Sequence, residues 1–177
     1  MPCKNAVIPY LDELTPAEKA IQAVNTIVND NGRLVGHNTD GCGYTQNLRR
    51  NGVEVKGKRI VLLGGGGAAS AIAIQAALEG AAEIAVFNRR DEFWPRVEKG
   101  LEAIGQAAPG YRITLRDLVV TDVVYSPAET RMLREARAAG CRTCDGLGML
   151  LCQGAEAFRL YNGLEMPIEE IRALLYA

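Results

Sequence analysis

Apolar and polar positions follow two different patterns along this chain, and the change comes near residue 59. Before it, two alternating runs flank Asp30-Asn31-Gly32, a turn sequence that predicts a β-hairpin. After it, short apolar runs alternate with helical segments, which predicts an α/β protein with a parallel sheet covered by helices on both faces. The predicted strands are residues 23–29, 33–37, 59–63, 83–87, 112–115, 119–125 and 141–144. The predicted helices begin at residue 16 and then span 40–51, 68–79, 92–106, 128–139, 148–161 and 167–176.

Two local sequences refine this outline. Thr15-Pro16-Ala17-Glu18 predicts a helix start in which Thr15 caps the helix and Glu18 completes a capping box. Only Arg116-Asp117-Leu118 separates two predicted strands, whereas a parallel connection needs a crossover of about a dozen residues or more. Either one of these strands is wrongly predicted, or a crossover segment is absent at this point.

The composition is that of an ordinary globular protein, with 48% hydrophobic residues, 23% charged residues and a net charge of −1. No basic stripe predicts nucleic-acid binding, no apolar run is long enough to span a bilayer, and the N-terminus does not resemble a signal peptide. Five cysteines, an odd number, argue against a disulfide framework and favour the reducing cytoplasm. Cys141 and Cys144 have neither a second pair nor a nearby histidine, so we expect no metal site.

Four consecutive glycines separate an apolar strand from an Ala-rich helix. Gly64-x-Gly66-x-x-Ala69 fits the dinucleotide-binding fingerprint, in which the first glycine makes the turn and the second admits a pyrophosphate. The N–H groups at the start of the helix then face the phosphates. The alternative is an ordinary glycine-rich turn between a strand and a helix. The cofactor contacts predicted from this loop are Gly64, Gly65, Gly66, Gly67 and Ala68.

The next strand ends in Asn88-Arg89-Arg90-Asp91, which lies about 20–25 residues beyond the glycines, where such folds contact the adenosine ribose. Arg89 and Arg90 favour NADP by pairing with its 2′-phosphate, whereas Asp91 favours NAD by accepting hydrogen bonds from the ribose hydroxyls. Asp91 is equally typical of a helix N-cap. The choice between NAD and NADP therefore stays open.

Several motifs in order along the chain together resemble the shikimate dehydrogenase family. Met1-Pro2-Cys3-Lys4 resembles its M-P-x-K motif, Ala23-Val24-Asn25-Thr26 its A-[VI]-N-T motif, and Asn38-Thr39-Asp40-Gly41-Cys42-Gly43 its N-T-D-G-x-G signature. The glycine loop and residues 145–155 also fit, and residues 88–93 are closer to the quinate/shikimate dehydrogenase branch. The resemblance implies a Rossmann-like fold with a truncated N-terminal substrate domain. It divides the chain into a substrate-domain remnant (1–45), a dinucleotide-binding domain (46–157) and a C-terminal helix that returns toward the substrate domain (158–177).

The same resemblance implies an oxidoreductase that moves a hydride between NAD or NADP and a ring hydroxyl of shikimate or quinate, in aromatic amino acid biosynthesis. It implies that Lys4 exchanges the hydroxyl proton while Asp40 orients it, and that both bind the substrate together with Asn25 and Gln153. The further cofactor contacts that it implies are Val123, Val124, Tyr125, Ser126 and Gly146, beside the nicotinamide. Taken singly, Lys4 is also typical of a mobile terminus and Asp40 of a helix cap.

The chain departs from the family pattern in two places. The family carries further sequence before M-P-x-K, so we expect Lys4 to lie on a fraying terminus. It also carries a helix, a strand and a nicotinamide-binding loop in the interval that is shortened here near residues 115–119. We therefore expect poor geometry for hydride transfer and a weak or inactive catalyst. The alternatives are a non-catalytic nucleotide-binding remnant and an incomplete chain that needs partner material. The expected partner is a small-molecule substrate, and we expect neither nucleic acid nor a membrane as a partner. The sequence does not decide whether the chain forms a homodimer.

Overall fold

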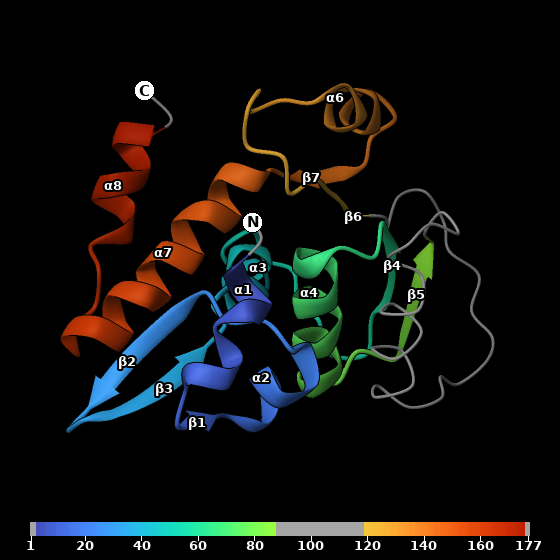
Figure 1. The fold of residues 1–177 in the computed structure, drawn as a ribbon. Helices are drawn as coiled ribbons and strands as arrows, with labels where there is room; N and C mark the ends of the chain where they lie inside the picture. The colour runs from blue at the N-terminus through green and yellow to red at the C-terminus, as the bar shows by residue number, and fades with distance from the viewer. Residues whose placement is uncertain (1–2, 88–118, 176–177) are drawn as a thin grey trace.

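The structure is a computed structural model that describes residues 3–87 and 119–175 (Figure 1). The predicted ribose contacts at 88–91, the predicted helix 92–106 and the predicted strand 112–115 lie outside the described residues. Within them, helices alternate with mostly parallel strands, so the predicted α/β fold class is confirmed.

The N-terminal part is built around the predicted hairpin. Its elements are α1 (Cys3–Ala6), the 3₁₀ helix η1 (Ile8–Tyr10), β1 (Glu13–Leu14), α2 (Pro16–Ile21), β2 (Thr26–Asp30) and β3 (Arg33–His37). The hairpin turns at Asn31 and Gly32, whose φ angles of 51° and 94° are the positive values that these residue types tolerate best. β1 pairs in parallel with β3, which gives a three-stranded sheet in the order β1-β3-β2. The hairpin prediction is therefore confirmed, whereas α1, η1 and β1 were not predicted.

A helix connects this hairpin to a strand–helix–strand unit. The elements are α3 (Asp40–Arg50), β4 (Arg59–Leu63), α4 (Gly67–Leu78) and β5 (Glu83–Phe87). β4 and β5 pair in parallel along their whole length, from Arg59 opposite Glu83 to Leu63 opposite Phe87. In Figure 1, α4 returns alongside the two strands, as a parallel crossover requires.

The C-terminal part adds a second parallel pair. Its elements are β6 (Val119–Thr121), α6 (Arg131–Ala138), β7 (Arg142–Cys144), α7 (Gly146–Asn162) and α8 (Ile168–Leu175). Two boundaries differ from the prediction for local reasons. β6 stops well before Tyr125, because Asp122 Oδ1 accepts a hydrogen bond from the Val124 N–H at 3.0 Å and turns the chain. α7 starts two residues early, because Asp145 Oδ1 accepts the Gly148 N–H at 2.9 Å and caps the helix.

The parallel strands form two separate pairs rather than the single sheet predicted from Arg59 onward. Among the described residues, β4 pairs only with β5, and β6 pairs only with β7. The junction at residues 116–118, where the sequence predicts that a crossover segment is absent, lies outside the described residues. Val61 and Leu63, which alternate with the buried Leu62 along β4, are 55% and 75% exposed. One face of this strand therefore has little cover.

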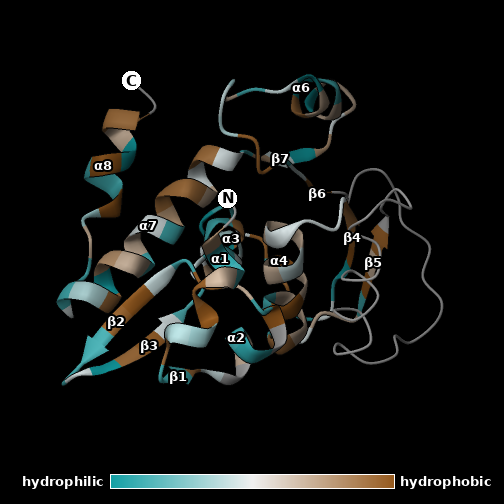
Figure 2. Cartoon of the chain, viewed as in Figure 1, coloured by the Kyte–Doolittle hydropathy of each residue, from teal (hydrophilic) through white to brown (hydrophobic). Residues whose placement is uncertain are grey.

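Helix α3 packs against both α4 and α7 at the centre of the molecule. Two glycines allow this approach: a Cβ on Gly41 would lie 2.5 Å from the Ala71 carbonyl oxygen, and one on Gly43 would lie 2.6 Å from Gln153. Helix α6 carries both hydrophilic and hydrophobic residues (Figure 2), and its buried residue is Leu133. The main core cluster consists of Tyr44, Leu48, Val53, Val55, Leu62, Ile72, Ala73, Ala76, Cys144 and Met149. None of the described helices is long and apolar enough to cross a membrane.

Candidate active site

The two residues that the family resemblance assigns to proton transfer lie in direct contact. Lys4 Nζ is 2.5 Å from Asp40 Oδ2, and the two side chains are 21% and 13% exposed. Lys4 comes from α1, and Asp40 is the first residue of α3. The Lys4 carbonyl also accepts a hydrogen bond from the Val24 N–H at 2.8 Å. Lys4 is thus held through both its backbone and its side chain, and the expectation that it lies on a fraying terminus is wrong.

The amide of Asn25 holds the other carboxylate oxygen of Asp40. Asn25 Nδ2 donates to Asp40 Oδ1 at 3.0 Å and to Thr39 Oγ1 at 3.2 Å. Asn25 Oδ1 accepts from the Thr39 N–H and from the Thr26 hydroxyl, both at 3.0 Å. These bonds use both amide hydrogens and both lone pairs of the oxygen. Asn25 therefore fixes the carboxylate that faces Lys4, a role that the sequence did not indicate.

Gln153 reaches the same cluster from the other end of the chain. Thr39 Oγ1 donates to Gln153 Oε1 at 3.1 Å, across 114 positions of sequence. Gln153 Nε2 donates to the Leu150 carbonyl at 3.1 Å, which leaves its second hydrogen for a ligand. Thr39 is only 1% exposed and joins the cluster through both its hydroxyl and its N–H. Thr39 was not among the predicted site residues, although its place within the N-T-D-G signature is a usable signal.

A buried carboxylate supports the turn before Asp40. Glu18 is 5% exposed, and its Oε1 accepts a hydrogen bond from the Asn38 N–H at 2.9 Å. α2 does begin at Pro16, but Thr15 makes no side-chain cap bond, so the predicted capping box is wrong. The N–H groups of the first helical turn can be satisfied by water, whereas leaving the buried N–H of Asn38 bare costs about 1–3 kcal/mol. Glu18 therefore turns toward the interior.

The glycine loop follows β4 at the carboxyl end of the strand, the edge where parallel sheets bind ligands. Gly64 has a φ of +105°, a conformation that L side chains rarely adopt. A Cβ at Gly66 or Gly67 would meet no atom of the described residues within 4 Å. The first helical bond of α4 runs from the Ser70 N–H to the Gly66 carbonyl, so the earlier N–H groups point out of the helix start. This geometry fits a diphosphate group.

The residues assigned to the nicotinamide lie at the start of α7. A Cβ on Gly146 would lie 2.5 Å from the carbonyl oxygens of Val123 and Val124, so only glycine lets this backbone rest against the helix. The side chains of Val123, Val124 and Tyr125 are 41%, 44% and 56% exposed, and Ser126 is exposed as well. The segment after β6 therefore presents an apolar strip beside the N-terminus of α7.

Helix α3 connects the polar cluster to this strip. One turn after Asp40, Tyr44 Oη lies 2.7 Å from Thr121 Oγ1, at the end of β6. Burial raises the pKa of Tyr44, which keeps the phenol neutral. One turn further on, Asn47 Nδ2 donates to the carbonyl of Asp145, the cap of α7, at 3.2 Å. A single rigid helix thus sets the spacing between the carboxylate and the segment after β6.

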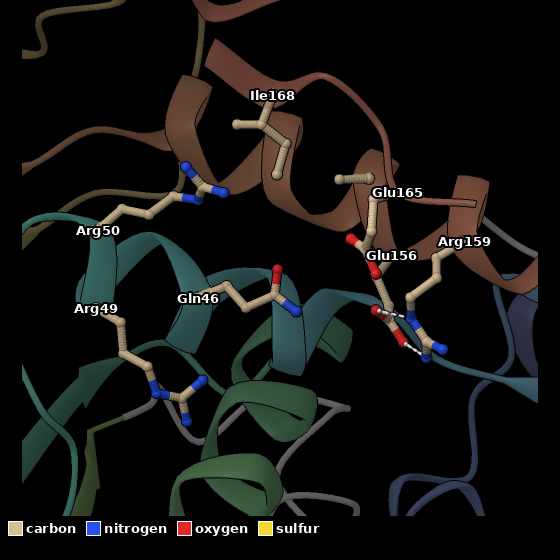
Figure 3. A pocket seen from close by; sticks show the side chains of 8 residues that line it. Gln46, Arg49, Arg50, Glu156, Arg159, Glu165 and Ile168 are labelled. Atoms are coloured by element: carbon tan, nitrogen blue, oxygen red, sulfur yellow. Dashed lines mark hydrogen bonds and ion pairs between the residues drawn. The ribbon is translucent and has the colours of Figure 1, made fainter. Parts of the chain in front are cut away.

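A separate hollow of about 390 Å³ lies between α3, α7 and the start of α8 (Figure 3). Most of its charges are already paired: Glu156 accepts two bonds from Arg159, at 2.6 and 3.0 Å, and Arg50 pairs with Glu169. The Arg159 hydrogen bonds hold the pKa of Glu156 below its usual range. No predicted site residue lines this hollow, so it is a polar groove apart from the candidate site. Its lining residues are Gln46, Arg49, Arg50, Ala155, Glu156, Arg159, Glu165 and Ile168.

Three cysteines of the described residues, Cys42, Cys144 and Cys152, are poor nucleophiles, and the last two are buried. Burial raises the pKa of Cys42 to about 12 and also raises the pKa values of Cys144 and Cys152. Such thiols stay protonated near neutral pH. In residues 3–87 and 119–175, no group of three or more histidine, cysteine or acidic side chains is placed to hold a metal ion.

Known proteins that are similar to this chain identify its family. Residues 146–176 match the family model of the shikimate 5'-dehydrogenase C-terminal domain. A shikimate dehydrogenase (NADP(+)) of Listeria monocytogenes is 38% identical over 218 residues, covering 99% of this chain and 75% of the relative. A quinate/shikimate dehydrogenase of Escherichia coli is 39% identical over 217 residues, with 99% of this chain and 75% of the relative covered. The chain belongs to the shikimate dehydrogenase family.

A solved structure of a shikimate dehydrogenase shares the fold. The Listeria monocytogenes enzyme in complex with shikimate and NAD matches with a TM-score of 0.90 and 38% identity, over 99% of this chain and 75% of that one. The Rossmann-like architecture and the family resemblance drawn from the sequence motifs are therefore confirmed.

The alignment with the Listeria shikimate dehydrogenase is longer than this chain. It spans 218 positions, 41 more than the 177 residues present here, although it covers 99% of the chain. The relative therefore carries at least that many residues, inside the matched span, that have no counterpart here. This agrees with the shortening expected from the Arg116–Leu118 junction, which lies outside the described residues.

Proposed function

We propose that this chain is an NAD(P)-dependent oxidoreductase that acts on a ring hydroxyl of shikimate or quinate. The observation that supports this most strongly is the 2.5 Å contact between Lys4 Nζ and Asp40 Oδ2. Asn25 and Gln153 belong to the same hydrogen-bonded cluster, although they come from distant parts of the chain. An incidental ion pair would not gather two side-chain amides around it.

In the proposed reaction, the hydride and the proton of the alcohol are transferred to different groups. When bound, NAD or NADP supplies the hydride acceptor or donor at its nicotinamide ring. As a neutral amine, Lys4 Nζ accepts the hydroxyl proton while the carbon–hydrogen bond breaks and becomes the ammonium that pairs with Asp40, and this ammonium returns the proton in the reverse direction. Asp40 keeps the Lys4 amine in place, and Gln153 offers its remaining amide hydrogen to a substrate hydroxyl. Orientation of this kind contributes up to about 7–11 kcal/mol in well-aligned reactions.

The cofactor site is proposed from the shape of the backbone. Gly64–Gly67 and the N–H of Ala68 hold the diphosphate, while Val123–Ser126 and Gly146 border the nicotinamide. One Listeria monocytogenes relative is named for NADP(+), and a solved structure of a Listeria monocytogenes relative is a complex with NAD. Asn88–Asp91 are the residues proposed to choose between them.

A second candidate function is a nucleotide-binding remnant without catalysis. The separation of β4–β5 from β6–β7 and the exposure of Val61 and Leu63 favour it. Both features lie on the cofactor side of the molecule, where an incomplete wall would let the nicotinamide ring move away from the hydroxyl. In this second hypothesis, the glycine loop still binds the dinucleotide, but the chain does not catalyse hydride transfer.

The test is to follow reduced-nicotinamide absorbance with shikimate and quinate, each with NADP and NAD, and to titrate each dinucleotide separately. The matched variants are Lys4→Met and Lys19→Met, the second on an exposed side chain of α2. Turnover that is lost in Lys4→Met and kept in Lys19→Met supports the dehydrogenase. Saturable dinucleotide binding without turnover supports the remnant. Absence of both overturns the two proposals together.

Four further points belong to this proposal. The division into residues 1–45, 46–157 and 158–177 places α3 across the first boundary, where it would couple substrate and cofactor parts. The odd number of cysteines favours the reducing cytoplasm. The family resemblance favours a place in aromatic amino acid biosynthesis, and sedimentation of the purified chain would test for a homodimer.

A further inference from the structure

Among the described residues, Glu18 is a buried acidic side chain close to the proposed site that the proposed reaction does not use. It is 5% exposed, and its Oε1 accepts the backbone N–H of Asn38 at 2.9 Å. Its Oε2 is buried and has no hydrogen-bond partner in the part of the chain that the structure describes. A buried carboxylate with a bare oxygen is costly, so a specific gain must offset the cost.

The stabilising interaction that offsets this cost is found in the turn that leads to Asp40. Asn38 Oδ1 accepts the Asp40 N–H at 3.0 Å, and Asn38 Nδ2 donates to the Ala23 carbonyl at 3.0 Å. The backbone of Asn38 is thus held by Glu18, while its side chain holds the N–H of Asp40. Two consecutive hydrogen bonds join the buried carboxylate of α2 to the first residue of α3.

The direction of the Asp40 side chain depends on this turn. Asp40 Oδ2 faces Lys4 at 2.5 Å and Oδ1 faces Asn25 at 3.0 Å, so a small rotation of the backbone would break one contact or both. Asn25 is itself anchored on the neighbouring Thr39 N–H at 3.0 Å. Asn25, one of the two partners of the carboxylate, is therefore also held by the turn at residues 38–40.

We propose that Glu18 is a positioning residue that fixes the Asn38–Asp40 turn and thereby aims the Asp40 carboxylate at Lys4. Glu18 acts through Asn38 and does not touch substrate or cofactor. This inference rests on the proposed function for its consequence in catalysis, but its geometric content can be tested without turnover. The competing interpretation is that Glu18 only adds stability to the packing of α2.

The test measures how fast an amine-selective acylating reagent modifies Lys4, by peptide mapping, with Lys19 as the internal reference. Glu18→Met removes the acceptor while keeping the volume of the side chain. If the pairing of Lys4 with Asp40 loosens, labelling of Lys4 should rise by up to about fivefold, the factor that corresponds to a partly exposed ion pair. Glu18→Gln keeps an oxygen acceptor for the Asn38 N–H and should restore slow labelling.

The control residue is Glu79, whose carboxylate connects α3 to α4 away from the Asn38–Asp40 turn. Glu79 Oε1 accepts from Thr45 and Gln75, both at 2.8 Å, and its Oε2 pairs with Arg49 at 2.5 Å. Glu79→Met should lower stability without changing Lys4 labelling. Equal labelling in Glu18→Met and Glu79→Met, at equal loss of stability, would overturn the proposal, as would unchanged labelling in a folded Glu18→Met.

If Glu18→Met does not fold, the variant Asn38→Ala takes its place in the labelling experiment. It cuts the same path at the next hydrogen bond, so it should raise Lys4 labelling as well, and unchanged labelling would overturn the proposal. Because labelling reports the geometry alone, a positive result stands even if no turnover is found. In an active chain, Glu18→Met should lower kcat and leave the cofactor KM unchanged.

Discussion

The Lys4–Asp40 cluster and the glycine loop are organised in opposite ways. In the cluster, side chains bond to one another, and Asn25 has all its hydrogen-bonding capacity occupied by protein groups. The loop is shaped by the backbone of Gly64, and no atom of the described residues lies within 4 Å of a Cβ built on Gly66. One half of the proposed site is complete in the protein itself, and the other is a surface that a ligand has to complete.

This difference separates the energetic roles of the two regions. In a preorganised polar cluster, few side chains have to become ordered when the substrate binds, so the free-energy cost of binding is small. Such a cluster can hold the reacting groups in the orientation that the reaction needs. An open loop gains its stability from the ligand: at 100 times the dissociation constant, binding adds about 2.7 kcal/mol to folding stability. The cofactor should therefore stabilise this chain strongly, and changes to the two regions should have separable effects.

The largest expected effect comes from breaking the cluster with Asp40→Asn. Lys4 then loses its carboxylate partner, and turnover should fall by a factor of about 10²–10⁴. Dinucleotide affinity should not change, because the glycine loop makes no use of Asp40. Steady-state assays and a dinucleotide titration measure the two effects, with the exposed Asp30→Asn as control. A matching loss of dinucleotide affinity would show that the two regions are not independent.

The next effect comes from filling the space over the loop. Gly66 has a φ of −70°, so Gly66→Val should fold normally, yet its side chain would occupy the place of the diphosphate. Dinucleotide affinity should fall at least about tenfold, or ~1.4 kcal/mol. Gly64→Val should instead lower stability by about 1–2 kcal/mol, because of the positive φ. Thermal melts with and without NADP distinguish the two, and a normal cofactor-induced shift in Gly66→Val would contradict the proposed diphosphate site.

A smaller effect tests the helix that joins the two regions. Tyr44→Phe removes the hydroxyl that lies 2.7 Å from Thr121 Oγ1 and should cost about 0.5–1.5 kcal/mol of unfolding free energy. Urea denaturation of Tyr44→Phe, Thr121→Val and the double variant completes a mutant cycle. Fully additive losses would mean that this contact does not couple α3 to β6.

The smallest effect should come from a pair that belongs to neither region. Glu156→Gln removes the bonds from Arg159, three positions along α7, and should cost about 0.2–0.5 kcal/mol. Because Arg159 lowers the pKa of Glu156 in the folded protein, this contribution is present above the ordinary pKa of glutamate and is lost as the pH falls through the folded value. The wild-type and Glu156→Gln stabilities should therefore converge in acid. A difference that persists there would assign the effect to packing, and turnover should be unchanged throughout.

Sequence patterns by themselves determined the elements whose causes are local. Asn31-Gly32 specifies its hairpin turn through positive φ angles, and the four glycines specify a strand–turn–helix unit. The motifs also named Lys4, Asp40, Asn25 and Gln153, but only through a resemblance, since no local rule brings residues 4 and 153 together.

Tertiary structure decided what each of these side chains does. Glu18 fits a capping box by spacing, yet it serves the buried N–H of Asn38, because a buried donor gains more from a partner than a solvated helix end does. Lys4 is ordered only because α1 packs where the Val24 N–H and Asp40 can hold it. Among the described residues, the parallel strands from Arg59 onward form two pairs, because strand pairing depends on which segments lie side by side in space, and periodicity does not encode that.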